Sequence, residues 1–174
     1  EGFVALLAHK VINEGVITAR KGTVAFASGD KVTLDFSGDG LLNIEIDPST
    51  IDTNIENKNL VVADGGLVYM SSKVANDAFS STISNTGTIQ ANSLEERDGK
   101  IILFAHDGTM NVDGTLEAKE GFVETSGAKV VIADTLRVKA KEMLIDPKNI
   151  TVTSSSNTAL DTSAFVVGRN NYVT

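Results

Sequence analysis

Along most of the chain, apolar and polar residues alternate with a period of two. The alternation is clear in the apolar pairs Ile17/Ala19, Val24/Phe26, Val68/Met70 and Ile101/Leu103. A period of two is typical of a β-strand with one buried face, because successive side chains of a strand point to opposite sides. No helical periodicity of useful length is present. The pattern therefore predicts an all-β protein.

The alternating segments repeat along the chain. Each copy places an alanine at one position, at residues 19, 63, 91, 118 and 140, with spacings of 44, 28, 27 and 22 residues. A unit of roughly 20 to 28 residues explains these spacings if the first interval holds two units. Gly2 to Leu6 repeats the second half of the unit 20 residues before Gly22, so we expect the chain to begin inside a repeat.

Two short strands per unit cannot bury their apolar face alone. Identical units stacked about 4.8 Å apart would cover one another, which predicts a parallel β-solenoid. In this arrangement the repeated alanines fill inward corners, and Thr18, Arg20, Thr23 and Lys100 face water.

Two residue types mark the bends of the unit. Glycines recur at Gly22, Gly66, Gly99 and Gly121, where we expect them to supply a positive φ at the turn. Asparagines share another repeat position at Asn13, Asn57 and Asn85. Asparagine tolerates the left-handed region, and its amide bonds to the backbone of its own turn or to an asparagine above it. We interpret these three residues as a structural ladder.

One segment interrupts the repeat. Residues 32–36 and 41–46 alternate, and Ser37-Gly38-Asp39-Gly40 separates them. This pattern predicts a β-hairpin over about residues 32–46 that projects from the stack or covers its side. We assign residues 1–152 to the solenoid and residues 153–174 to a Ser/Thr-rich tail, in which Ala164 to Val167 favour one last strand.

The composition of the chain excludes or disfavours several classes of function. The chain has 174 residues, of which 41% are hydrophobic and 5% aromatic, and its formal charge is −8. This charge, without a run of Lys or Arg, disfavours nucleic acid as a partner. Without cysteine, disulfides, thiolate metal sites and a cysteine nucleophile are excluded. No stretch reaches the roughly 20 apolar residues of a membrane-spanning helix.

The repeats resemble the secretion-domain region of TpsA-type exoproteins, which Gram-negative bacteria export by two-partner secretion. The family includes filamentous haemagglutinin, the high-molecular-weight adhesins and the haem-haemopexin-binding exoproteins. The resemblance extends to about Val152. It is carried by the segments Ala5 to Ala8, Val11 to Ile17, Val32 to Leu42, Ala63 to Gly66, Asn85 to Ser93, Gly121 to Gly127 and Ala140 to Pro147.

The resemblance implies a right-handed parallel β-helix in a secreted, surface-associated, non-catalytic adhesin or haemagglutinin-like protein. It also implies an outer-membrane TpsB transporter as partner, passage through the periplasm, and a host receptor or glycan bound by the full-length protein. The family's amino-terminal cap and Asn-Pro-Asn motifs are missing from this sequence, so we expect no export by this stretch alone. A haem-acquisition exoprotein and a carbohydrate-active β-helix enzyme are the alternatives.

Few residues are candidates for catalysis or metal binding. His9 and His106 share one register but lie several rungs apart, too far to share a metal ion, and neither has an evident Ser and Asp partner for a triad. Asp30, Asp35, Asp39 and Asp47 are the acidic candidates for a glycosidase or lyase. We assign no catalytic residue, cofactor or metal. Asn149 lies in an Asn-Ile-Thr sequon and is a candidate for glycosylation.

Overall fold

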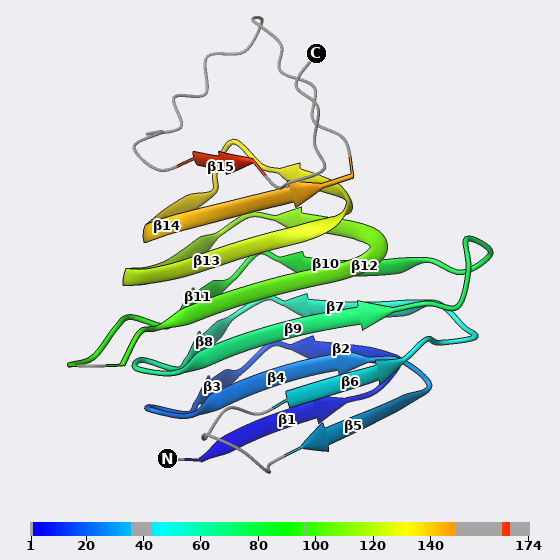
Figure 1. The fold of residues 1–174 in the computed structure, drawn as a ribbon, viewed down its shortest axis with the longest axis horizontal. Helices are drawn as coiled ribbons and strands as arrows, with labels where there is room; N and C mark the ends of the chain where they lie inside the picture. Colours follow the sequence, from blue (N-terminus) through cyan, green and yellow to red (C-terminus); the bar gives the residue numbers. More distant parts are fainter. Residues whose placement is uncertain (1, 36–42, 96, 149–164, 168–174) are drawn as a thin grey trace, which may run out of the picture.

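A computed structural model describes residues 2–35, 43–95, 97–148 and 165–167 of the chain. All regular elements in these ranges are strands, and they wind into a stack of parallel coils (Figure 1). The predicted parallel β-helix is therefore confirmed. Within the described residues, no helical segment that is long and apolar enough to span a bilayer is found.

Each coil contributes to three sheet faces, and the longest strands bend from one face to the next. The first face contains β1 (Phe3–Leu7), β4 (Thr23–Ser28), β9 (Leu67–Lys73) and parts of β12 (Lys100–Val112), β13 (Thr115–Ile132) and β14 (Arg137–Pro147). The second contains β2 (Lys10–Asn13), β7 (Thr53–Asn57), β10 (Ser81–Asn85) and further parts of β12 and β13. The third contains β3 (Val16–Thr18), β8 (Leu60–Val62), β11 (Thr88–Gln90) and the first residues of β13 and β14.

Inward side chains stack in rows because the parallel strands keep one register across the coils. One row of the first face runs through Leu6, Phe26, Met70, Leu103, Thr125 and Ile145. Its members Phe26, Met70 and Leu103 are fully buried. Such rows form the narrow core, which supports the interpretation of the alternating pattern as inward and outward positions.

The first alanine interval, from Ala19 to Ala63, is a single coil. Residues 23–28 pair with residues 67–72, so the prediction of two units in this interval is wrong. The additional residues form the excursion that contains β5 (Lys31–Asp35) and β6 (Asn43–Asp47), which pair antiparallel as a separate sheet. The predicted hairpin is therefore present, and its connection at residues 36–42 lies outside the described residues.

The hairpin lies against the outer side of the first face rather than projecting from it (Figure 1). Ala25 and Ala27 point outward from β4, since Val24 and Phe26 point into the core, yet both alanines are fully buried. Ile46 of β6 is also buried. Small outward residues on β4 thus leave room for the hairpin's apolar side.

Gly22, Gly66, Gly99 and Gly121 lie just before or within strands of the first face, and the expectation of a positive φ there is wrong. The left-handed conformation occurs one residue earlier at three of these positions, at Lys21, Gly65 and Glu120, but not at Asp98 before Gly99. The four glycines are needed for space instead: a Cβ on Gly66 would lie 1.9 Å from the backbone oxygen of Gly22 on the neighbouring coil.

The position predicted for Thr23 is wrong, and the strand predicted near the carboxyl end is present. Thr23 is only 9% exposed rather than facing water, because it lies in register between Phe3 and Leu67 on the adjacent coils. Near the carboxyl end, β15 (Phe165–Val167) pairs in parallel with Met143 to Ile145, which confirms the predicted last strand.

Candidate functional site

Three asparagines lie one above another at the corner after the second face. The Asn13 Nδ2 atom donates to Oδ1 of Asn57 at 2.8 Å, and Asn57 Nδ2 donates to Oδ1 of Asn85 at 2.8 Å. The last amide ends on the backbone oxygen of Asp113 at 2.7 Å, because Val112 replaces asparagine on the next coil. The amides are satisfied by one another, so this column is a structural element rather than a ligand site.

A second polar column, which the sequence analysis missed, lies at the corner after the third face. Gln90 Nε2 donates to Asp64 Oδ2 at 2.7 Å, and the backbone amide of Asn92 donates to Asp64 Oδ1 at 2.9 Å. Asn92 Oδ1 in turn accepts from the backbone amide of Lys119 at 2.9 Å. A signal was available in the sequence, since Asp64, Asn92 and Lys119 directly follow the repeated alanines 63, 91 and 118.

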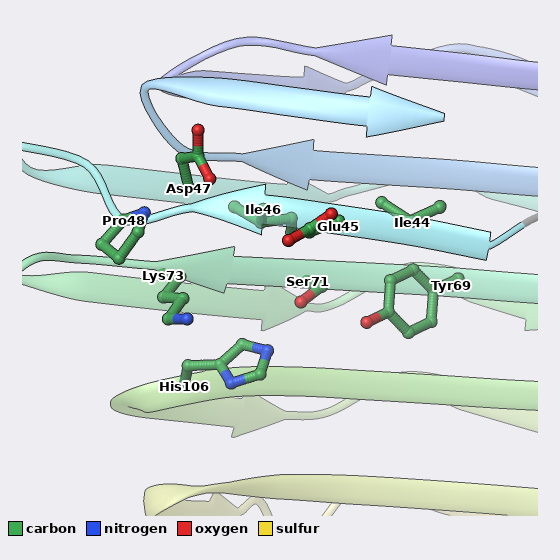
Figure 2. A pocket seen from close by; sticks show the side chains of 9 residues that line it. All are labelled: Ile44, Glu45, Ile46, Asp47, Pro48, Tyr69, Ser71, Lys73 and His106. Carbon is green, nitrogen blue, oxygen red and sulfur yellow. The ribbon is translucent and has the colours of Figure 1, made fainter. Parts of the chain in front are cut away.

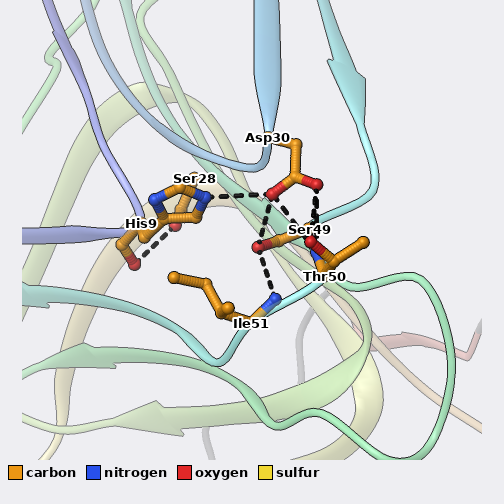
Figure 3. A network of polar contacts seen from close by, with 6 residues as sticks. All are labelled: His9, Ser28, Asp30, Ser49, Thr50 and Ile51. Atoms are coloured by element: carbon orange, nitrogen blue, oxygen red, sulfur yellow. Dashed lines mark hydrogen bonds and ion pairs between the residues drawn. The ribbon is translucent and has the colours of Figure 1, made fainter.

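His9 belongs to a polar cluster at the base of the hairpin (Figure 3). Its Nε2 atom lies 3.0 Å from Asp30 Oδ1, and Ser49 Oγ donates to the same oxygen at 3.1 Å. The other carboxylate oxygen of Asp30 accepts from Thr50 Oγ1 at 3.0 Å. His9 therefore has an aspartate and a serine close by that the sequence pattern did not indicate, because the excursion returns Ser49 to the level of Asp30.

The order of contacts in this cluster differs from that of a hydrolytic triad. A triad places the histidine between the carboxylate and the nucleophile, whereas here Asp30 lies between His9 and Ser49. Hydrogen bonds from His9 and then Thr50 lower the pKa of Asp30 to about 2. The cluster joins the start and the end of the excursion to the first coil. Its contacts therefore stabilise the position of the excursion.

A groove of about 290 Å³ lies between the hairpin and the first face (Figure 2). One wall is formed by outward side chains of adjacent strands: Tyr69, Ser71 and Lys73 alternate along β9, and His106 lies beside Lys73 on β12. The other wall is β6 with the residue after it, from Ile44 to Pro48. Nothing in the sequence indicated this groove, because it depends on where the hairpin packs.

His106 is partly buried and its ring packs on Phe104, with ring centroids 3.8 Å apart. Burial, followed by the positive charge of Lys73, lowers the pKa of His106. Its imidazole is consequently biased toward the neutral form, with one donor and one acceptor nitrogen. His9 lies in the first coil and His106 in the fourth, three rungs or roughly 14 Å apart along the axis.

The remaining candidates are dispersed. Asp47 lines the groove and lies 4.0 Å from the Lys31 ammonium, while Asp35 is at the far end of β5. Asp39 and the sequon residue Asn149 fall outside the described residues. Within the described ranges, no group of three or more potential metal ligands gathers.

The fold and the site together define a class: a parallel β-helix whose coils are joined by polar columns and which carries one hairpin on its outer side. No family model matches the chain, and no solved structure matches it.

The comparison with curated proteins adds one distant relative. The chain is 29% identical, over 140 residues, to the Heme/hemopexin-binding protein of Haemophilus influenzae. The match covers 80% of this chain and 15% of that protein, so the chain spans about a seventh of the relative's length. The name of this relative matches the haem-haemopexin-binding exoproteins, one of the types that the repeats resemble. The similarity therefore supports a relationship to this class of secreted exoprotein.

Proposed function

We propose that this chain is a stretch of the secretion domain of a large surface exoprotein exported by two-partner secretion. In this proposal it acts as a non-catalytic scaffold and folding template, with an adhesin or haemagglutinin-like role carried by the whole protein. The observation that carries the proposal is the continuous parallel register from β1 to β14. Each coil presents a row of backbone donors and acceptors on which the next coil pairs.

Templating gives a physical role to the register. A coil that pairs with the one before it buries apolar side chains and satisfies backbone groups. Folding outside the cell therefore opposes the return of the chain through its transporter. The expected partner is an outer-membrane TpsB transporter, and the expected location is the bacterial surface or the medium. The distant relative supports this setting.

The test is export of the whole exoprotein with its transporter, followed by pulse-chase of cellular and released protein. Ile89 is fully buried between Val61 and Leu116 on adjacent coils. Ile89→Asp should slow release, whereas Lys100→Ala, at an exposed position on the first face, should release normally. Unchanged release of the Ile89→Asp protein would refute the templating role.

A haem-acquisition exoprotein is the second candidate function, and the name of the relative favours it. In that case the whole exoprotein should bind haemopexin in a direct binding assay, while an adhesin should not. A carbohydrate-active enzyme receives less support, because Asp30 is occupied by His9, Ser49 and Thr50.

A further inference from the structure

The groove between the hairpin and the first face contains polar groups that the protein does not satisfy. Ser71 is fully buried and its Oγ atom has no hydrogen-bond partner, although it lines the groove. Among the described residues, no side-chain hydrogen bond or ion pair involves Tyr69, Lys73 or His106 either. Buried polar groups are nearly always bonded, so the unpartnered Ser71 hydroxyl indicates a place for a ligand, beside the partly exposed side chains of Tyr69, Lys73 and His106.

The two walls of the groove differ in polarity. The wall formed by β9 and β12 offers the Lys73 ammonium, the Ser71 and Tyr69 hydroxyls and one imidazole N–H of His106. On β6, Ile46 is buried, so Ile44 and Ile46 present their side chains to the groove, whereas the exposed Glu45 and Asp47 point to the other side of the strand. The Asp47 carboxylate lies 4.0 Å from the Lys31 ammonium. A ligand that complements both walls has an anionic group at the Lys73 end and a compact body against Ile44 and Ile46.

The size of the groove restricts the ligand further. Its volume of about 290 Å³ is at the lower end of small-molecule sites, which suits one sugar ring and exceeds the need of a bare carboxylate. Ile44, Ile46 and the Tyr69 ring supply apolar surface beside the polar groups (Figure 2).

We propose that this groove binds a carboxylate-bearing ligand of monosaccharide size, with the carboxylate held by Lys73, Ser71 and His106 and the ring against Ile44 and Ile46. The ligand lies along β9 beneath the hairpin. This binding is separate from the templating role and does not depend on it.

The experiment is a nuclear magnetic resonance titration of the 174-residue chain with D-glucuronate, D-glucose and acetate. The chain has two histidines, so His106 reports on the groove and His9 is an internal control. D-glucuronate should shift the His106 signals saturably, leave those of His9 in place, and bind at least tenfold more tightly than D-glucose or acetate.

Variants separate a specific site from a general charge effect. Lys73→Met should weaken D-glucuronate binding at least tenfold and Ser71→Ala several-fold, while Lys141→Met, at an exposed position on β14, should bind normally. The amide spectrum of each variant shows whether it is folded. If D-glucose or acetate binds as tightly as D-glucuronate, if His106 does not respond, or if the Lys73→Met protein retains full affinity, the proposal is overturned.

Discussion

Gly66→Ala tests whether the glycine column exists to let adjacent coils approach each other. The new Cβ would lie 1.9 Å from the backbone oxygen of Gly22, whereas carbon and oxygen normally come no closer than about 3.3 Å. The two coils would have to separate locally by about 1.4 Å. The hydrogen bond from the Leu67 amide to Gly22 O, now 3.0 Å, would then exceed bonding range.

The cost follows from these two effects. Overpacking costs about 1 to 3 kcal/mol, and an unsatisfied buried backbone group costs about 1 to 3 kcal/mol. We therefore expect Gly66→Ala to lower the free energy of unfolding by roughly 2 to 6 kcal/mol, a large share of the stability of a typical domain. Unfolding in urea, followed by far-UV circular dichroism, measures the change.

Two matched glycines serve as controls. Gly15→Ala meets only the Asn13 side chain at 4.0 Å and should change stability by less than about 0.5 kcal/mol. Gly65→Ala places alanine at a φ of +68° and should cost about 1 to 2 kcal/mol. If Gly66→Ala costs no more than Gly15→Ala, the close-approach explanation is wrong.

Three further predictions concern the core row, the asparagine column and the hairpin base. Thr125→Val should raise the free energy of unfolding by about 1 kcal/mol, because the fully buried Oγ1 of Thr125 has no partner; an unchanged or lower urea midpoint would contradict this. Asn57→Ala removes both ladder bonds and should cost roughly 2 to 5 kcal/mol in the same assay, and a loss below 1 kcal/mol would show that the column contributes little. The pKa of Asp30 is lowered to about 2 in the folded chain, so its ionised form stabilises the fold above its ordinary pKa, and this contribution disappears as the pH falls from about 4 through 2. Asp30→Asn should therefore flatten the acid side of the stability profile in thermal melts between these pH values, and an unaltered profile would contradict the stabilising role of the Asp30 carboxylate.

Much of the coil was predictable because a strand's side-chain direction follows from sequence alone. The period of two identified Val68, Met70, Ile101 and Leu103 as inward residues, and all four are fully buried. The hairpin was also predictable, since two alternating runs lie on either side of a short glycine-containing segment. These features depend on local geometry, which every copy of the repeat expresses.

The distances between coils and the position of the hairpin were decided by tertiary structure. The sequence marked Gly66 as a turn residue, but only the neighbouring coil shows that the space for a Cβ is occupied by Gly22. Likewise, Ser71 is an ordinary outward serine in the repeat until β6 covers it and forms the groove with His106. Such contacts join residues far apart in the chain, and no local pattern encodes them because they depend on how separate segments pack.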